Sequence, residues 1–136
     1  MSQLPAIQIA ISRYTDAVNS RNWAAFSKIF AEDATWEGIG LGVRFDGLDA
    51  ITQGLSKIVN DMSRFFQMNT PAVIEQNGER ASTRSAIYEI GEYDTTGTYF
   101  EAYGTYEDEL KMVNGEWRFH SRRFVRSMRK EGPIGG

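Results

Sequence analysis

The sequence contains no cysteine, and this absence excludes a disulfide framework, thiolate chemistry and cysteine-based zinc sites. It also lacks any apolar run near the roughly 20 residues that a membrane-spanning helix needs. The first residues, MSQLPAIQIAIS, have neither a basic region nor a small-residue cleavage site, so they do not resemble a secretory signal. We therefore expect a cytoplasmic protein with no membrane partner.

The chain has no excess of positive charge, because its formal net charge is −3. This balance argues against nucleic acid as the main partner. Basic residues nevertheless gather near the C-terminus: Arg118, Arg122, Arg123, Arg126, Arg129 and Lys130. One interpretation is a solvated last strand and tail, and the other is that one of these arginines points inward to bind an anionic group.

What is present indicates one domain, since 136 residues suffice for a single core and not for two. Apolar residues recur at helical spacing from Ile7 to Val18, with Pro5 suited to the first turn. Asn22 is a plausible N-cap for a short second helix from Trp23 to Phe30, which Asp33 ends. A third amphipathic helix is predicted from Leu48 to Met62.

From Arg64 onward the hydrophobic period changes to two, which is typical of strands. Asn77-Gly78 and Asn114-Gly115 are strong hairpin signals, and Asp94–Gly97 supplies a further turn. Shorter strands are expected at Ala34–Glu37 and Val43–Phe45. The long predicted strands are Phe65–Glu75, Arg80–Glu92, Thr98–Val113 and Glu116–Arg126.

Helices followed by an antiparallel meander predict an α+β fold with the helices packed on one face of the sheet. The domain is expected to span residues 1–129, and residues 130–136 are expected to form a loose tail.

Four blocks in this order resemble the SnoaL-like group of the nuclear transport factor 2-like superfamily. They read YTDAVNSRNWAAFSKIFAEDATWEG, RFDGLDAI, SRFFQMN and GTYEDELKMVNGEWRFHSR, and the resemblance covers roughly residues 6–126. The group includes scytalone dehydratase, bile acid 7α-dehydratase and hexachlorocyclohexane dehydrochlorinase. The resemblance implies a conical half-barrel with three helices over the concave face of a curved mixed or antiparallel sheet, a deep pocket between them, and assembly as a homodimer or homotrimer.

Dehydratase-like members of the group use a carboxylate on the first helix to orient a histidine on the third strand. This sequence has Asn19 and Phe65 at those positions. An amide cannot stabilise an imidazolium by charge, and a phenyl ring cannot take a proton. Asp16 lies one helical turn before Asn19 and shares roughly its face. The preferred interpretation is an ordinary exposed helix carboxylate, and the alternative is a substitute for the missing carboxylate at the mouth of the pocket.

The single histidine, His120, lies on the last strand two residues before Arg122. In a regular strand these two side chains share one face, and the resemblance implies that Arg122 points into the pocket. A bulge would break this parity. His120 is therefore either a pocket base or an unremarkable strand residue.

Three tyrosines, Tyr14, Tyr88 and Tyr106, are candidate hydrogen bonders in the pocket, although each could instead be a core ring. We expect Tyr14, Tyr106 and Arg122 to share one pocket. The predicted catalytic residues are Tyr14, Asp16, His120 and Arg122, and the predicted substrate-binding residues are Asn19, Trp36, Phe65, Tyr88 and Tyr106.

Neither metal-ligand spacing nor a nucleophilic triad is present, so no metal and no cofactor are expected. A mostly apolar pocket suits a hydrophobic cyclic or aromatic molecule. The sequence is compatible with a cofactor-independent lyase or isomerase that works by tyrosine and arginine polarisation with proton transfer. The alternative is a ligand-binding or accessory domain on the same scaffold without catalysis.

Overall fold

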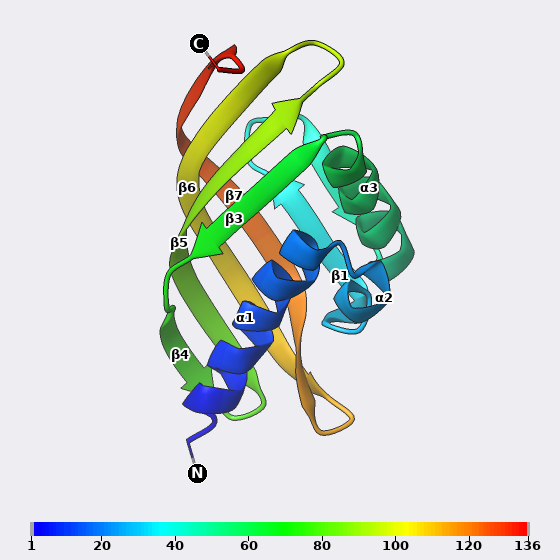
Figure 1. The fold of residues 1–136 in the computed structure, drawn as a ribbon. Helices are drawn as coiled ribbons and strands as arrows, with labels where there is room; N and C mark the ends of the chain where they lie inside the picture. Colours follow the sequence, from blue (N-terminus) through cyan, green and yellow to red (C-terminus); the bar gives the residue numbers. More distant parts are fainter. Residues whose placement is uncertain (1, 136) are drawn as a thin grey trace.

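The computed structural model describes residues 2–135 and contains one curved seven-stranded sheet with three helices against it (Figure 1). The strand order is β2-β1-β7-β6-β5-β3, with β4 also paired to β5. The elements are α1 (Leu4–Ser20), α2 (Trp23–Phe26), β1 (Phe30–Gly38), β2 (Val43–Asp46), α3 (Leu48–Asn60), β3 (Arg64–Asn69), β4 (Val73–Asn77), β5 (Arg80–Tyr93), β6 (Thr98–Val113) and β7 (Glu116–Pro133).

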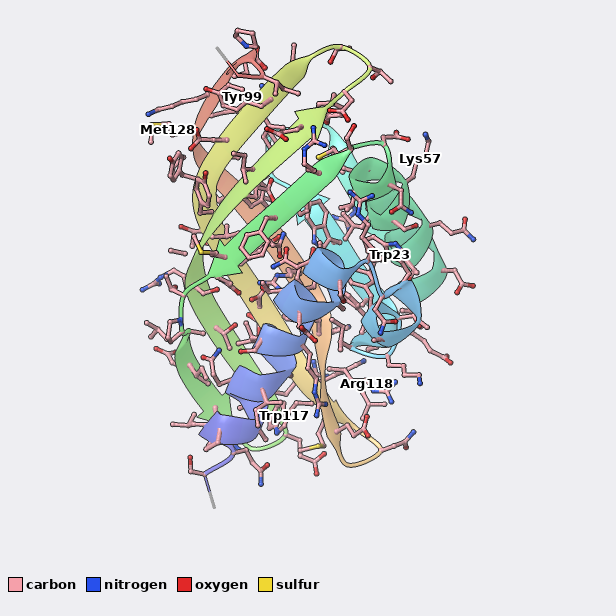
Figure 2. All side chains as sticks on the ribbon, viewed as in Figure 1. Trp23, Lys57, Tyr99, Trp117, Arg118 and Met128 are labelled. Carbon is pink, nitrogen blue, oxygen red and sulfur yellow. The ribbon has the colours of Figure 1, made fainter. Side chains whose placement is uncertain are left out.

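The helices lie on one side of the sheet, as the sequence predicts (Figure 1). Helix α1 buries the predicted stripe from Ile7 to Val18 and carries Pro5 in its first turn. Helix α3 buries Ile51, Leu55 and Val59. Figure 2 shows the side chains that fill the space between helices and sheet. The predicted α+β class and the helix-covered face are confirmed.

Helix α2 is shorter than predicted, because it ends at Phe26. The Asn22 side chain accepts a hydrogen bond from the Ala25 N–H at 3.1 Å, so the predicted N-cap is present. Phe30 and Asp33 belong to β1 instead of the helix and its end. The apolar run to Phe30 fits a helix or a strand equally, and pairing of Phe30 with Phe119 of β7 selects the strand.

The strand predicted from Phe65 to Glu75 is two strands, β3 and β4, that both pair antiparallel with β5. Pro71 lies in the break between them. Proline has no N–H to give to a ladder and therefore interrupts it. The Asn114-Gly115 hairpin is present as predicted, and both residues have positive φ (50° and 81°).

Strand β7 continues to Pro133, past the expected end at Arg126 and into the expected tail. Met128 to Pro133 pair with Tyr103 to Thr98 of β6, so ladder hydrogen bonds hold this segment in the sheet. The sequence predicted a loose tail because the segment is rich in Lys, Glu and Gly. Its pairing partner, β6, lies far away in sequence, so no local pattern indicated the strand.

Two bulges interrupt the pairing of β6 with β7. Glu109 pairs with Ser121 while Leu110 pairs with Phe119, which leaves His120 as an extra residue. Tyr103 pairs with Met128 while Gly104 pairs with Arg126, which leaves Ser127 as a second one. Each bulge inverts the alternation of β7, because one additional residue shifts every later side chain to the opposite face.

Glycine is required at position 104, beside the second bulge. A Cβ atom there would lie 2.5 Å from the Val125 carbonyl oxygen and 2.9 Å from the Phe124 ring. The backbone of β7 therefore approaches β6 too closely at this point for any side chain.

We expect Gly104→Ala to lower the free energy of unfolding by about 2 kcal/mol or more, because a backbone oxygen cannot move aside as a flexible side chain can. Gly132→Ala is the matched control, since its Cβ would meet only the Tyr99 ring edge at 3.2 Å. Urea denaturation measures both variants. Equal losses in the two variants would contradict a close approach specific to Gly104.

Candidate functional site

A cavity of about 610 Å³ lies between α1, α3 and the concave face of the sheet. Its volume falls within the range of pockets that hold drug-sized ligands. Most of its wall is apolar and includes Val18, Leu41, Leu55, Val59, Met62 and Phe124. The wall also contains a smaller number of polar side chains: Tyr14, Trp36, Gln67, Glu89, Tyr93, Tyr106, Arg126 and Arg129.

The first polar group is the pair of tyrosines Tyr14 on α1 and Tyr106 on β6, which both line the cavity. Their rings meet edge to face at 5.8 Å between centroids. Trp36 also lines the cavity, and its Nε1–H donates to the Tyr14 hydroxyl at 3.2 Å. With its oxygen accepting from Trp36, the Tyr14 hydroxyl can donate its own hydrogen to another oxygen.

Arg122 lies beneath the two tyrosines and is fully buried. Its guanidinium carbon is 3.5 Å from the Tyr106 ring centroid, 4.1 Å from that of Tyr14 and 4.7 Å from that of Phe119. The cation thus lies close to three aromatic rings, and such contacts stabilise a desolvated guanidinium. The structure brings Tyr14, Tyr106 and Arg122 together, with the tyrosines in the cavity wall and the arginine behind them.

The charge of Arg122 is balanced by Asp108, whose side chain is also fully buried. Arg122 Nε lies 3.3 Å from Asp108 Oδ1 in a close ion pair without hydrogen-bond geometry. Thr83 donates to Asp108 Oδ2 at 3.2 Å, and Arg122 Nη2 donates to the Asn69 side-chain oxygen at 3.4 Å. Burial raises the pKa of Asp108 to about 6, although Arg122 and Thr83 act to lower it.

Burial also raises the pKa of both cavity tyrosines, although the nearby charge of Arg122 opposes this shift. Tyr14 and Tyr106 therefore keep their protons near neutral pH. Protonated hydroxyls in a water-poor cavity are hydrogen-bond donors, so they can stabilise negative charge on a bound oxygen.

Sequence reasoning missed Glu89, a carboxylate on β5 that lines the same cavity. Burial raises the pKa of Glu89 to about 7, with Arg129 acting in the opposite direction. The charge of Glu89 in turn acts to raise the pKa of Tyr14 and Tyr106, as expected for groups on one cavity. Glu89 is the neighbour of the predicted candidate Tyr88, and the two side chains point to opposite faces of β5. The sequence did not show which of the two faces the cavity.

Tyr88 faces away from the cavity. It stacks on Tyr103 at 5.0 Å between centroids, and its hydroxyl donates to Glu101 at 2.9 Å. Burial and this hydrogen bond raise the pKa of Tyr88 to about 12. Strand alternation explains its position, because neighbours along a strand point to opposite faces.

The two positions of the missing dyad have different environments. Phe65 lines the cavity as an apolar wall residue. Asn19 is outside the cavity wall, and its amide makes a matched pair of 2.9 Å hydrogen bonds with the backbone N–H and carbonyl of Gln67. Asn19 thus ties α1 to β3, because its amide supplies both the donor and the acceptor.

His120 and Asp16 do not line the cavity. His120 is the bulged residue of β7, so it does not share the face of Arg122 as a regular strand would require. Its Nε2 lies 3.5 Å from the exposed carboxylate of Asp33, which also pairs with Lys111 at 3.0 Å. Asp16 is exposed on α1 beside a shallow groove that contains Asn69.

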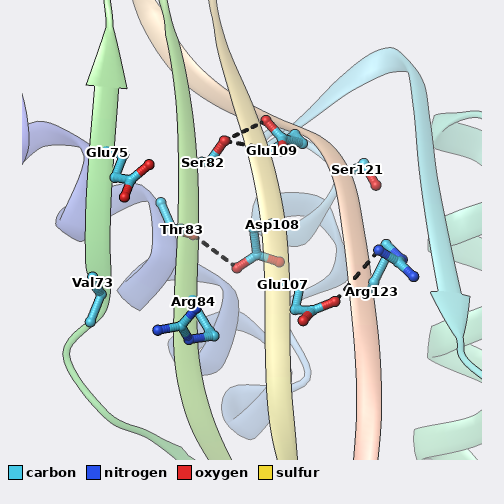
Figure 3. A pocket seen from close by; sticks show the side chains of 10 residues that line it. All are labelled: Val73, Glu75, Ser82, Thr83, Arg84, Glu107, Asp108, Glu109, Ser121 and Arg123. Atoms are coloured by element: carbon cyan, nitrogen blue, oxygen red, sulfur yellow. Dashed lines mark hydrogen bonds and ion pairs between the residues drawn. The ribbon is translucent and has the colours of Figure 1, made fainter.

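A depression on the outer face of the sheet is the other candidate surface (Figure 3). Two of its carboxylates have partners in the sheet: Glu109 accepts from Ser82, and Glu107 lies 3.5 Å from Arg123. The lining of the depression is mainly polar and includes one hydrophobic residue, Val73, whereas the cavity has a mostly apolar wall with a few polar groups.

No three His, Asp or Glu side chains in residues 2–135 lie close enough together to hold a metal ion. The same part of the chain has no helix of the length and apolar character needed to cross a bilayer.

A curved sheet whose concave face is covered by helices, with a cavity between the two layers, defines the cystatin-like α+β class. The chain belongs to the SnoaL-like domain family, whose model matches residues 2–123. Among curated proteins, no sequence matches the chain.

Solved structures agree on the fold at low sequence identity. A provisionally named scytalone dehydratase from Novosphingobium aromaticivorans superposes with a TM-score of 0.85 at 22% identity, covering 98% of this chain and 94% of that protein. The hexachlorocyclohexane dehydrochlorinase LinA-type3 from Novosphingobium barchaimii gives 0.82 at 19%, covering 97% and 90%. A protein of unknown function with a cystatin-like fold from Nostoc punctiforme gives 0.75 at 16%, covering 90% of each chain.

Glu89 predicts a pH-dependent stability. Its folded-state pKa of about 7 lies above its ordinary value of 4.5, so the native state binds the proton more tightly than the unfolded state does. Stability should therefore fall as pH rises from about 4.5 to about 7 and remain lower above that range. We expect Glu89→Gln to be more stable than the parent by on the order of 3 kcal/mol at about pH 8 and similar to it at about pH 4.

Thermal unfolding at both pH values measures this difference. Glu75→Gln is the matched control, because Glu75 is exposed and outside the cavity. The raised pKa of Asp108 also makes stability fall as pH rises, but it does so equally in the parent and in Glu89→Gln. Its contribution therefore cancels in the stability difference between the two proteins. If Glu89→Gln stabilises the protein equally at both pH values, the idea that ionising Glu89 destabilises the folded state is contradicted.

The Arg122–Asp108 pair makes a second prediction. Arg122→Met leaves Asp108 buried without a cation, and we expect a loss of about 3–5 kcal/mol in the free energy of unfolding. Adding Asp108→Leu removes the unpaired charge, so the double variant should recover most of that loss. Urea denaturation of the two single variants and the double variant measures the coupling, and additive losses would contradict it.

Proposed function

We propose that this protein is a cofactor-independent lyase or isomerase for a hydrophobic cyclic or aromatic substrate. The observation that carries the proposal is one carboxylate with a pKa near neutral, Glu89, in the same apolar cavity as two protonated tyrosines. A group with a pKa near the working pH is best suited to accept and return a proton.

In the proposed reaction, the substrate ring occupies the apolar part of the cavity with a carbonyl or phenol oxygen near Tyr14 and Tyr106. Ionised Glu89 removes a proton from the carbon next to the carbonyl, and the electron pair of that C–H bond moves toward the oxygen. The tyrosine hydroxyls then hydrogen-bond the enolate oxygen as its negative charge develops. Such donors contribute several kcal/mol of barrier lowering in known enzymes.

The enolate has two possible outcomes. In a lyase, its electron pair forms a C=C bond while a neighbouring C–O bond breaks, and the departing hydroxide takes the proton from Glu89 and leaves as water. In an isomerase, Glu89 returns the proton to a different carbon. Both outcomes balance without a cofactor and restore ionised Glu89.

Trp36 and Arg122 support the donor role of Tyr14. Trp36 donates to the Tyr14 oxygen, which leaves the hydroxyl hydrogen of Tyr14 available for the substrate. The Arg122 cation acts to lower the pKa of both tyrosines against the effect of burial. Arg122 therefore acts through the tyrosines and is proposed as a positioning residue.

The test is turnover of a panel of cyclic ketones that carry a β-hydroxyl group or a β,γ-double bond. Formation of the conjugated product is followed by its ultraviolet absorbance. For any member that reacts, we expect Glu89→Gln to lower kcat/KM by about 10²–10⁴-fold and Tyr14→Phe by about 10–10²-fold. His120→Gln and Asp16→Asn should stay within about 2-fold of the parent, since neither residue lines the cavity.

Native mass spectrometry of the purified protein gives the complementary result. A retained small molecule, together with no turnover of that molecule or of the panel, would support the alternative of a ligand-binding domain without catalysis. Activity that persists in Glu89→Gln and disappears in His120→Gln would reject the proposed base.

A further inference from the structure

The second polar region of the cavity consists of two arginines on β7, Arg126 and Arg129. Both side chains belong to residues that are exposed to solvent, and both also line the cavity. They therefore lie where the cavity opens, whereas Tyr14 and Tyr106 lie in its buried wall.

The Ser127 bulge is what brings both arginines to the cavity. Residues three apart in a regular strand point to opposite faces, so without the bulge only one of them could line it. With Ser127 as the extra residue, Arg126 pairs with Gly104 and Arg129 pairs with Ala102. Met128 then falls on the outer face, where Figure 2 shows it pointing away from the helices and where it is 47% exposed.

Only one of the two arginines is needed to neutralise the cavity wall. Glu89 is the only acidic residue of the described chain in that wall, so two cations face one carboxylate and leave an excess of one positive charge when Glu89 is ionised. Within residues 2–135, no carboxylate lies within ion-pair distance of Arg126. The partner of Arg129 is Glu131, an exposed side chain on the same strand, and such surface pairs are weak.

The position of Arg129 is fixed by an aromatic contact. Its guanidinium carbon lies 4.9 Å from the ring centroid of Phe100, which also lines the cavity. Small residues flank the arginines on β6, because Ala102 and Gly104 occupy the paired positions. Neither paired residue has a polar side chain that could engage the guanidinium donors.

We propose that Arg126 and Arg129 form a carboxylate-binding subsite, so that the substrate is a ring compound with an acid group. The inference rests on the proposed function for the ring and its reacting oxygen, and it adds the acid group as the feature that orients the ring. The acid end faces the cavity opening, and the ring extends toward Tyr14 and Tyr106. Guanidinium groups suit this role because they bind a planar carboxylate through two parallel N–H donors.

Binding of a matched pair of probes tests the subsite without any turnover. Isothermal titration calorimetry of the full chain at about pH 8 compares naphthoate with its uncharged amide, which has the same ring. We expect the carboxylate to bind about 10-fold more tightly at about 20 mM salt and less selectively at about 200 mM, because the subsite is exposed to solvent.

Arginine variants locate the effect. Arg126→Gln and Arg129→Gln should each lower the preference for the carboxylate to about 3-fold, and the double variant should abolish it while binding the amide as the parent does. Arg123→Gln is the control, since Arg123 lies on the outer face beside Glu107 (Figure 3) and carries the same charge. It should leave the preference unchanged.

Equal affinity for acid and amide, a preference that survives in the double variant, or an equal loss in Arg123→Gln would each overturn the inference. Failure of the proposed function gives a different result, namely a carboxylate preference with no turnover of acidic or neutral ring ketones. Turnover of neutral ketones without any preference for the acid would reject the subsite alone.

Discussion

A buried cation organises this protein. Arg122 is fully buried, makes cation–π contacts with Tyr14, Tyr106 and Phe119, and pairs with the buried side chain of Asp108. Burying a guanidinium costs free energy unless its charge is balanced by a nearby carboxylate. Moving either Arg122 or Asp108 would leave the other buried without a counter-charge, so the pair fixes the positions of both side chains. The arrangement draws α1, β6 and β7 together at one point and sets the tyrosines in the cavity wall.

The position of Arg122 depends in turn on the β-bulge at His120. Trp117 and Phe119 face the core, and regular alternation would carry Arg122 to the outer face. The bulge at His120 restores it to the core side and leaves the imidazole beside Asp33, away from the cavity. A single extra residue therefore admits the cation and excludes the chain's only histidine.

The cavity that results has a different arrangement from the carboxylate–histidine dyad implied by the family resemblance. Asn19 serves as a clamp between α1 and β3, and Phe65 is part of the apolar wall. The near-neutral titrating group is instead Glu89, whose pKa is raised by burial among apolar side chains. In the proposed reaction, proton transfer thus depends on the buried environment of an ordinary carboxylate.

The sequence by itself determined the two long helices, the Asn114-Gly115 hairpin and the α+β class, because hydrophobic period and turn chemistry are local properties. It also indicated Tyr14 from the apolar stripe of the first helix, Trp36 from a short strand, and Tyr106 from strand alternation together with the family resemblance. Only the tertiary structure decided the roles of His120, Glu89, Arg126 and Arg129. Their facing depends on strand register and on two bulges, and these are fixed by pairing between residues distant in sequence, which no local pattern records.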